Sequence, residues 1–321
     1  MTLSSSSIQD PIRARVVARR HLAAHIDEFV LGPSAEFPLP AWTPGSHIDL
    51  HTPTGLVRQY SLCPSPGETG RYRIAVERRT DSRGGSRSTH DDLSEGMEVR
   101  IGPPRNHFAL TRALSYVFVA GGIGITPLVS LAAEADRAGR PWRLIYVGRS
   151  REEMAFADEL EGRHPGLVTI YESSRTGRPD LTAELSGLAR GTAVYACGPP
   201  SMLDAVEDAC GPQPAVDAFT ERFTAATTEM AHDTEFELSL ALSGVTVTVP
   251  PDRTILDVLG VSGVVAPASC REGICGTCET GVVSGEVDHR DSILSPEERA
   301  ENESMMICVS RCTSGRLVLE L

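Results

Sequence analysis

The sequence lacks several features that define large classes of proteins. It contains no lysine, so its 30 basic residues are all arginine, a bias that reflects genome composition rather than function. No apolar run approaches the roughly eighteen residues that a membrane-spanning helix requires. The first residues show no basic segment followed by an apolar one, so we expect no secretory signal.

Positive charge is also scarce. The 43 acidic residues outnumber the arginines and give a net charge of −13, which argues against nucleic-acid binding. From residue 227 to 321 there are sixteen Asp and Glu against six Arg, a difference of −10. Such an acidic segment either keeps the protein in solution or steers a basic partner into a short-lived complex.

Disulfide-rich scaffolds are a further class that the cysteines argue against. Four of the eight cysteines follow the plant-type [2Fe–2S] spacing, C-x4-C-x2-C with a distant fourth, in which thiolates hold two bridged irons. The predicted ligands are Cys270, Cys275, Cys278 and Cys308. Thiolates persist in a reducing compartment, so we expect a cytoplasmic protein.

Other interpretations of these cysteines are a zinc site and a set of buried thiols. Zinc sites usually combine two C-x2-C pairs, and only one occurs here. Gly273 and Gly276 allow a tight loop whose backbone N–H groups point at the sulfurs, as iron–sulfur clusters require. Cys312 lies four residues beyond Cys308. We predict that Cys308 is the ligand and Cys312 a bystander.

Residues 1–112 are typical of a β-barrel. Apolar and polar residues alternate in segments such as 47–50 and 72–76, which indicates half-buried strands. Proline and glycine turns separate many such short segments. The pattern predicts an antiparallel barrel.

Two places in this region carry residues suited to a flavin. In Arg58-Gln59-Tyr60-Ser61, arginine can hold a phosphate, tyrosine can lie along a flat ring, and serine can bond to a ring edge. In the segment 83–88, Arg-Gly-Gly-Ser-Arg-Ser, the paired glycines allow N–H groups to form an anion-binding nest. Taken singly, the first could be an ordinary core strand and the second a surface loop. Together they favour a site for flavin mononucleotide, FMN.

The periodicity changes in residues 113–226. Segments at 116–120, 143–147, 167–171 and 193–196 predict strands, and segments at 128–138, 152–160 and 201–209 predict helices between them. Alternating strands and helices define a doubly wound α/β domain. Ligands of such domains bind at the carboxyl ends of the strands.

A glycine-rich turn follows the first of these strands. The turn Gly121-Gly122-Ile-Gly124 leads into a helix, with Thr126 predicted as its N-cap and Pro127 as its first residue. Free N–H groups at a helix start favour a pyrophosphate, so the turn predicts a dinucleotide site. Pro127 stands where the usual G-x-G-x-x-G pattern has its third glycine, so the motif depends on its strand–helix context.

Two other segments bear on this site. Cys197-Gly198-Pro199 ends the last predicted strand, and Cys197 is either a small buried residue or a neighbour of the redox centre. Arg149 and Ser150 end the second strand, where they could accept the 2′-phosphate of NADP or form a solvated loop. The preference between NADH and NADPH therefore stays open.

Phe223 follows this region and is either ordinary core or a cover for a flat cofactor ring. The small polar residues 224–233 then indicate a linker. Residues 227–321 predict a small mixed α/β module that contains the cysteine loop. We expect three domains, at 1–112, 113–226 and 227–321.

In this order, the three segments resemble the class IA oxygenase reductases, a family that includes phthalate dioxygenase reductase and vanillate demethylase reductase. The resemblance covers nearly the whole chain. It rests on Arg58-Gln-Tyr-Ser-Leu-Cys63, Gly84-Gly-Ser86, Gly121-Gly-Ile-Gly-Ile-Thr-Pro127, Cys197-Gly-Pro199 and the four cysteines. It implies a multidomain fold, with an antiparallel β-barrel flavin domain, a doubly wound α/β nucleotide-binding domain and a plant-type ferredoxin domain resembling a β-grasp.

The resemblance also implies residue roles and partners. It places Thr126, Cys197 and Phe223 at the reacting rings, without a general acid or base. The implied cofactor contacts are Arg58, Gln59, Tyr60, Ser61, Ala75, Val76, Glu77, Gly84, Gly85, Ser86, Arg87, Gly121, Gly122, Gly124, Thr126, Pro127, Arg149, Ser150, Cys197, Gly198, Pro199 and Phe223. The implied path runs from NADH, or NADPH, through FMN and the [2Fe–2S] cluster to a terminal oxygenase of the Rieske type, docked transiently on a monomer.

Three other functions compete with this one. A cytochrome P450 is an alternative acceptor, and a stand-alone flavin or ferric reductase would need no ferredoxin module. In a different class, the chain is an electron-carrier module whose first two-thirds is scaffold. The glycine turn between strand and helix counts against that interpretation, and a lack of NADH oxidation would favour it.

Overall fold

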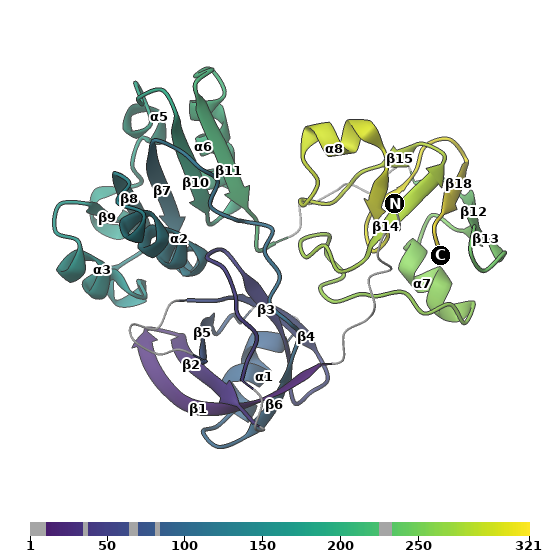
Figure 1. Ribbon diagram of the computed structural model, residues 1–321, viewed down its shortest axis with the longest axis horizontal. Helices are drawn as coiled ribbons and strands as arrows, with labels where there is room; N and C mark the ends of the chain where they lie inside the picture. The colour runs from purple at the N-terminus through teal and green to yellow at the C-terminus, as the bar shows by residue number, and fades with distance from the viewer. Residues whose placement is uncertain (1–10, 35–37, 64–69, 81–83, 225–232) are drawn as a thin grey trace. The chain divides into compact units, whose positions relative to one another are not determined.

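The computed structural model of the protein describes residues 11–34, 38–63, 70–80, 84–224 and 233–321. The chain forms two compact units, 1–223 and 224–321, whose elements are labelled in Figure 1. Most of the predicted linker, at 225–232, lies outside the described residues.

The first sheet of unit 1 is the predicted antiparallel barrel. Its strands are β1 (Ile12–Ala23), β2 (Ile26–Pro33), β3 (His47–His51), β4 (Val57–Ser61), β5 (Tyr72–Glu77) and β6 (Glu98–Ile101). They pair in the order β4-β3-β6-β1-β2-β5. A bridge between Cys63, just after β4, and Arg73 of β5 joins the two ends of this order. The barrel therefore closes beside the segment that was predicted to bind a flavin.

The second sheet of unit 1 is parallel. Its strands are β7 (Ser115–Gly121), β8 (Trp142–Gly148), β9 (Val168–Glu172), β10 (Thr192–Cys197) and β11 (Val216–Glu221), in the order β11-β10-β7-β8-β9. The connecting helices are α2 (Ile125–Arg137), α3 (Ala157–Arg163), α4 (Ser173–Thr176), α5 (Leu181–Glu184) and α6 (Pro200–Cys210). This is the doubly wound arrangement, and the direction of winding reverses between β7 and β10.

Two sequence predictions for this sheet were wrong. The helix predicted at 152–160 is a short 3-10 turn, Arg151–Glu153, followed by α3, because Phe156 adopts a left-handed φ of 63° between them. The prediction also missed β11, which contains Phe219. This strand lies at the sheet edge and is only partly buried, so it lacks the continuous apolar run of a central strand.

The described part of unit 2 contains a five-stranded mixed sheet, a two-stranded sheet and two helices. The strands β12 (Phe236–Leu240), β13 (Thr246–Val249), β14 (Glu279–Ser284), β16 (Ser304–Met306) and β18 (Arg316–Leu319) lie in the order β13-β12-β18-β14-β16, and β15 (Val287–Asp288) pairs with β17 (Arg311–Cys312). The helices are α7 (Ile255–Val261), capped by Thr254, and α8 (Pro296–Glu301), with a capping box at Ser295. The central pair β12–β18 is parallel and β12–β13 is a hairpin, as expected for a ferredoxin module.

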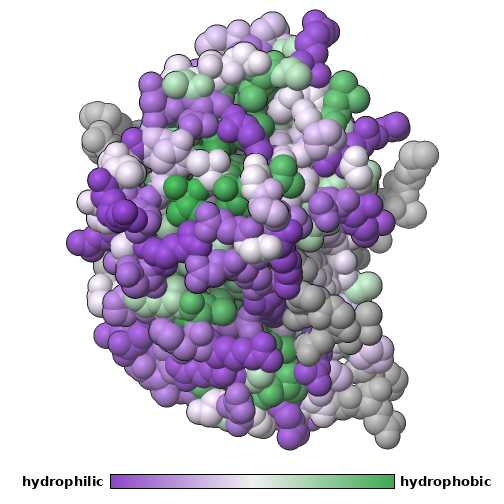
Figure 2. Space-filling model, turned by 90° about the vertical axis from the view of Figure 1, so that its left-hand side faces the viewer, coloured by the Kyte–Doolittle hydropathy of each residue, from purple (hydrophilic) through white to green (hydrophobic). Residues whose placement is uncertain are grey.

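Hydrophilic residues cover most of the face shown in Figure 2, and hydrophobic residues gather there only in small groups. Among the described residues, no helix combines the length and the apolar character needed to cross a membrane. The largest apolar side chains of the described chain instead lie in buried clusters, which include Tyr72, Tyr146, Tyr195 and Phe118.

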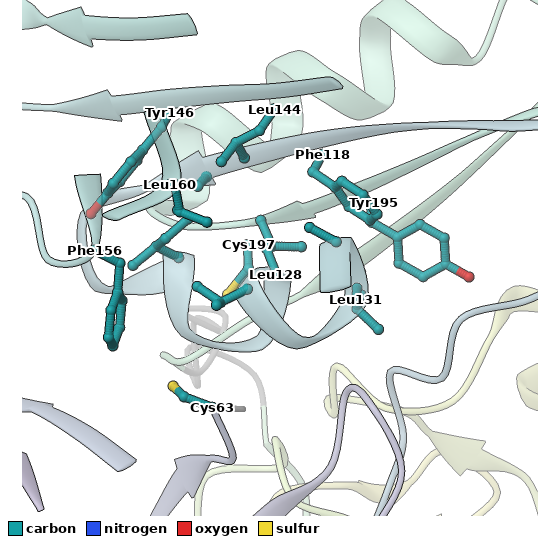
Figure 3. Packing of buried hydrophobic residues seen from close by; sticks show 14 of the residues in the cluster. Cys63, Phe118, Leu128, Leu131, Leu144, Tyr146, Phe156, Leu160, Tyr195 and Cys197 are labelled. Atoms are coloured by element: carbon teal, nitrogen blue, oxygen red, sulfur yellow. The ribbon is translucent and has the colours of Figure 1, made fainter. Parts of the chain in front are cut away.

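One of these clusters joins the barrel to the parallel sheet of unit 1. Cys63 and Ala75 of the barrel pack with Leu128 of α2, Tyr146 of β8 and Cys197 of β10. In Figure 3, Cys63 lies below the turn of α2 that carries Leu128. The barrel and the parallel sheet therefore share this cluster, in addition to a separate buried cluster in each.

A buried charged group lies at the same junction. The Nε atom of Arg73 in β5 donates a hydrogen bond to Glu28 in β2, and both side chains are almost fully buried. Arg73 Nη2 also lies 3.4 Å from the Glu159 Oε2 atom of α3, and the guanidinium carbon is 4.8 Å from the centre of the Phe156 ring. Arg73 therefore connects the barrel to the α3 region through an ion pair with Glu159 and a cation–π contact with Phe156.

We expect Arg73→Met to destabilise unit 1 strongly. The substitution leaves Glu28 buried with only the exposed Arg20 nearby, at 3.9 Å. Breaking a buried ion pair in this way typically costs about 3–5 kcal/mol. The matched control is Arg137→Met, which removes an exposed ion pair with Glu134 on α2 and should cost less than about 1 kcal/mol. Urea unfolding of both variants provides the measurement, and equal midpoints would contradict the assigned role of Arg73.

Candidate functional site

The carboxyl ends of β7 and β10 mark the reversal point of the parallel sheet. Strand register pairs Ala120 of β7 with Cys197 of β10. The turn that follows β7, residues 121–124, therefore lies beside the turn that follows β10, residues 197–199. Ligands of doubly wound sheets bind at this point, so the two predicted segments meet where a dinucleotide would lie.

The two turns touch backbone to backbone, and the contact requires glycine. A Cβ atom on Gly124 would lie 2.3 Å from the carbonyl oxygen of Cys197. A Cβ on Gly198 would lie 2.9 Å from the Cα atom of Gly121, and one on Gly121 would lie 2.6 Å from Pro199. These distances are shorter than real Cβ contacts allow. Glycine thus permits the close approach that a pyrophosphate site needs.

Helix α2 begins one turn earlier than predicted. A 3-10 turn over Gly122–Gly124, with a left-handed φ of 55° at Gly122, leads directly into the helix at Ile125. The predicted N-cap, Thr126, is therefore already helical, and its hydroxyl donates to the carbonyl of Ile123 at 3.0 Å. Pro127 lies within the first turn, where its missing N–H costs no intrahelical hydrogen bond. The free donors at this helix start still suit an anion.

A buried carboxyl group lies next to Cys197. Strand register places Glu221 of β11 opposite Cys197, and the Oε2 atom of Glu221 is buried with no hydrogen-bond partner among the described residues. Burial raises the pKa of Glu221 to about 8. Burial, together with the Glu221 carboxylate, raises the pKa of the Cys197 thiol. Cys197 is therefore an uncharged thiol. Phe223, which is partly buried, packs against the hydrophobic cluster that contains Cys197.

The Glu221 carboxyl group should make the stability of unit 1 depend on pH. Its pKa in the folded protein exceeds the ordinary value of 4.5, so the folded protein keeps a proton that the unfolded chain releases between about pH 4.5 and 8. Stability should therefore fall as pH rises through this window, and Glu221→Gln should remove the effect. We expect the free energy of unfolding of the wild type, measured with urea, to fall by about 4 kcal/mol relative to that of the variant between pH 5 and 9. Parallel pH profiles would contradict this expectation.

In the barrel, Arg58 and Tyr60 of β4 face helix α1 (Gly85–Asp92). A Cβ on Gly85 would lie 2.3 Å from Arg58 Nε, so the arginine side chain crosses the start of the helix. The Tyr60 hydroxyl lies 3.2 Å from that of Thr89, one turn further along. The first turn of α1 has no acidic residue. A guanidinium group beside the positive end of a helix is favourable when an anion lies between them, so this pair fits a phosphate.

The predicted glycine loop is the beginning of α1. Gly84 is the N-cap with a left-handed φ of 91°, and Gly85, Ser86 and Arg87 form the first helical turn. The sequence did not predict this helix because two glycines and several serines are poor helix formers. The Ser86 hydroxyl accepts a hydrogen bond from the N–H of Arg79 at 3.2 Å. Arg83 lies outside the described residues.

Strand alternation separates the other predicted flavin contacts. Gln59 points away from α1 and donates to an aspartate of β3 at 3.1 Å, and Ser61 is buried on the same side of the strand. In β5, Ala75 packs toward α2, Val76 packs into the barrel core, and Glu77 is partly exposed. The structure thus groups Arg58, Tyr60 and Gly85, whereas Gln59 and Val76 face elsewhere.

Sequence reasoning assigned no role to two residues of this site. The thiol of Cys63 donates to the carbonyl of Thr126 at 3.5 Å and so connects β4 to α2. Burial raises the pKa of Cys63 to about 12, which keeps this donor protonated. The second is Glu221, described above. Cys63 is the last residue of the segment Arg58–Cys63, and Glu221 stands two residues before Phe223; these positions were the only available signals.

The end of β8 bears on whether Arg149 and Ser150 would accept a 2′-phosphate. The Arg149 side chain is exposed, whereas the Ser150 hydroxyl is hydrogen-bonded to the carboxylate of Glu152. Register also places Glu172 of β9 opposite Gly148, the last residue of β8. Two carboxylates therefore lie near the end of β8, where the adenosine ribose of a dinucleotide was expected. Carboxylates there favour a ribose hydroxyl over a 2′-phosphate.

In unit 2, the four predicted cluster ligands form one group of buried thiols. Hydrogen bonds connect Cys275 to Cys270, Cys270 to Cys308, and Cys308 to Cys278. The pKa of Cys308 is lowered by its bond with Cys270 but raised more by Cys278 and by burial, to about 12. The bond to Cys270 and burial likewise raise the pKa of Cys275. The raised pKa values of Cys275 and Cys308 favour neutral thiols, and metal binding would displace their protons.

The loop that carries these thiols directs backbone donors at sulfur. The N–H of Glu272 lies 3.3 Å from Cys270 Sγ, and the N–H of Gly273 donates to Cys308. Gly273 and Gly276 have left-handed φ angles of 68° and 69°. Such N–H···S bonds stabilise the reduced state of an iron–sulfur cluster.

Cys312 stands apart from the thiol group. It lies in β17, and its sulfur is 3.3 Å from the hydroxyl oxygen of Ser314. Within the described part of the chain, no group of three or more His, Cys, Asp or Glu residues could hold a single metal ion. A [2Fe–2S] cluster makes a different demand, because its four thiolates are shared between two irons. Four adjoining buried thiols with backbone donors fit such a cluster.

Comparison with known proteins agrees with this geometry. Residues 118–208 match the family described as oxidoreductase NAD-binding domain, and residues 240–313 match the 2Fe-2S iron-sulfur cluster binding domain. The chain is 39% identical over 320 residues to the phenoxybenzoate dioxygenase subunit beta of Ectopseudomonas oleovorans, covering 99% of this chain and 100% of that protein. It is also 39% identical over 315 residues to the phthalate dioxygenase reductase of Burkholderia cepacia, covering 97% of each.

Solved structures show the same architecture. Phthalate dioxygenase reductase matches with a TM-score of 0.71 and 39% identity over 97% of this chain and 98% of that one. An intact type IV self-sufficient cytochrome P450 monooxygenase matches with a TM-score of 0.90 and 38% identity. That match covers 100% of this chain but 43% of the P450 chain, so this protein spans less than half of its length.

Fold and site together define a multidomain oxidoreductase with a flavin-type barrel, an NAD-binding domain and a [2Fe–2S] domain. The chain belongs to the family of oxygenase reductases that contains phthalate dioxygenase reductase. The predicted family, fold class and cofactors, namely FMN, NAD and a [2Fe–2S] cluster, are confirmed.

Proposed function

We propose that this protein takes electrons from NADH and delivers them singly to a separate terminal oxygenase, with a Rieske-type oxygenase as the first choice. When bound, the cofactors supply the redox chemistry: hydride donation by NADH, conversion of electron pairs to single electrons by FMN, and one-electron storage by the cluster. The observation that carries the proposal is the presence, in one chain, of a dinucleotide-type turn contact and a four-thiol group.

The residues of unit 1 would bind and orient the two nucleotides. Arg58 and the start of α1 would hold the FMN phosphate, and Tyr60 would border the ring. The turns at 121–124 and 197–199 would hold the dinucleotide pyrophosphate. Thr126, Cys197 and Phe223 would line the reacting rings, with Cys197 as an uncharged neighbour rather than a nucleophile. The Cys63 thiol would hold Thr126 in place by its hydrogen bond to the backbone carbonyl of Thr126.

The thiols of unit 2 would hold the cluster. Cys270, Cys275, Cys278 and Cys308 would be the ligands, and the N–H groups of Glu272 and Gly273 would lower the energy of the reduced state. The acidic composition of this unit favours an acceptor with a basic docking surface and a complex that forms and separates quickly. None of the eight cysteines forms a disulfide, which supports a reducing, cytoplasmic location. We propose a monomeric reductase.

The electron path is tested by stopped-flow mixing of the protein with NADH in the absence of oxygen. The account expects the flavin absorbance to decrease first and the iron–sulfur absorbance to follow. Bleaching of the iron–sulfur band before the flavin band would contradict the proposed order.

The names of the relatives favour a separate oxygenase, whereas the P450 structure keeps a P450 acceptor as the alternative.

NADH should be preferred over NADPH. Glu152 and Glu172 would repel a 2′-phosphate, so we expect kcat/KM for NADH to exceed that for NADPH by at least about tenfold. Glu152→Gln should raise kcat/KM for NADPH and leave kcat/KM for NADH nearly unchanged. The ratio of the two values should therefore become smaller. Initial rates with both nucleotides provide the measurement. A wild-type preference for NADPH would contradict the role assigned to Glu152 and Glu172. It would instead favour Arg149 and Ser150 as ligands of the 2′-phosphate.

A further inference from the structure

An exposed apolar segment leads from helix α7 of unit 2 into the cysteine loop. It runs from Val261, the last residue of α7, to Ser269, and none of its nine residues is buried. The side chains of Val261 and Val265 are among the most exposed apolar ones of the described chain, at 77% and 82%. Val264 and Ala266 pack partly against the core, so Val265 between them faces outward. We call Val261 and Val265 the valine patch.

This exposure has an energetic cost for an isolated reductase. Single apolar side chains on a surface are ordinary. Residues 264–268, Val-Val-Ala-Pro-Ala, are instead five consecutive apolar residues that all remain at least partly exposed. Such runs are avoided on soluble proteins unless they serve a function. Aliphatic surface of this kind contributes favourable free energy only when another surface covers it.

The valine patch lies beside the four-thiol group. Asp257 and Val261 are four residues apart on α7 and therefore adjacent on its surface. Arg271, the residue after Cys270, reaches the same place, with its Nη1 atom 3.3 Å from Asp257 Oδ1. Cys270 is also the most exposed of the four thiols, at 9%. The segment that carries both valines thus leads directly into Cys270, the ligand position at which a cluster held by these thiols would come nearest to solvent.

We propose that the valine patch is the contact surface for the electron acceptor. The occupant that fits is a redox protein with an apolar contact area surrounded by arginine or lysine side chains. Exposed apolar side chains would supply the core of the interface, while Asp257 and Glu272 belong to its polar rim. Unit 2 carries the net charge of −10 that attracts such a partner. Electron tunnelling falls steeply with distance, which favours docking at the exposed edge of the cluster. This proposal rests on the proposed function.

The test uses the full-length, cofactor-loaded protein with the double substitution Val261→Ser and Val265→Ser. Cytochrome c, a basic haem protein, is the acceptor probe. The matched control is Leu242→Ser, because Leu242 is 80% exposed on the same unit but lies in the turn between β12 and β13. Removing two apolar contacts should raise the KM for cytochrome c about tenfold in the double variant. The control should keep the wild-type KM.

A second measurement separates the acceptor from the protein's own flavin unit. Mixed with NADH without oxygen, the double variant should bleach its iron–sulfur band at the wild-type rate. An unchanged KM for cytochrome c would overturn the proposal. Slower bleaching would also overturn it, since the patch would then serve electron entry from unit 1. If NADH does not bleach the flavin and iron–sulfur bands of the wild-type protein, the proposed function itself is wrong. The docking proposal, which rests on it, is then wrong as well.

Discussion

Substitution of Cys308 by alanine is expected to remove the iron–sulfur absorbance and to reduce NADH-driven reduction of cytochrome c by at least about a hundredfold. Residues that only support metal ligands typically contribute 10–100-fold, so loss of a ligand should have a larger effect. NADH should still reduce the flavin, because the proposed nucleotide-binding elements all lie in the other unit. Iron content and the visible spectrum provide the measurement.

Cys312→Ala is the matched control for this substitution. Cys312 lies four residues away on the same segment and is similarly buried, yet its sulfur contacts Ser314 rather than the thiol group. The control should therefore retain iron and its absorbance. Loss of iron from Cys312→Ala, with retention in Cys308→Ala, would reverse the assignment of the fourth ligand. Circular dichroism of both variants shows whether unit 2 still folds.

The second large effect is expected for Gly124→Ala. The added methyl group would lie 2.3 Å from the carbonyl oxygen of Cys197, so the two turns must move apart by about 1 Å. Displacements of this size in a binding site can cost about a hundredfold in rate. We expect kcat/KM for NADH to fall by about that factor, while dithionite still reduces both cofactors.

Gly162→Ala controls for the loss of a glycine as such. Gly162 lies in helix α3, has no left-handed φ, and offers open space to an added Cβ. Alanine there should be neutral or slightly stabilising and should leave NADH oxidation unchanged. If Gly124→Ala and Gly162→Ala had the same kcat/KM, the close contact of the turns would have no role in nucleotide binding.

The sequence predicted those parts of the fold whose signals are local. A continuous apolar run predicted β7, and the cysteine spacing predicted the thiol group, because each depends on neighbouring residues. The predicted helix at 152–160 is interrupted by Phe156, which has a left-handed φ and whose ring contacts Arg73, a residue far away in the sequence. Helix α1 was missed for a related reason. Its poor helix formers are held in place by Arg58 and Tyr60 of β4.

Contacts between distant segments were beyond sequence reasoning. The glycine segment after β7 is a 3-10 turn that leads into α2 earlier than predicted, and its backbone contact with residues 197–199 follows only from the strand order. The link from Cys63 to Thr126 joins the barrel to α2, and the buried carboxyl group of Glu221 lies on β11, a strand that the sequence did not predict. In each case the chemistry depends on tertiary placement, which residue spacing does not encode.

The central claim is that one chain carries a flavin and a [2Fe–2S] cluster that NADH reduces. The most direct test is the visible spectrum of the purified protein without oxygen, recorded before and after addition of NADH. The account predicts flavin bands over broad iron–sulfur absorbance, with both bleached by NADH. A spectrum with flavin alone and no protein-bound iron would contradict it, as would two chromophores that neither NADH nor NADPH can reduce.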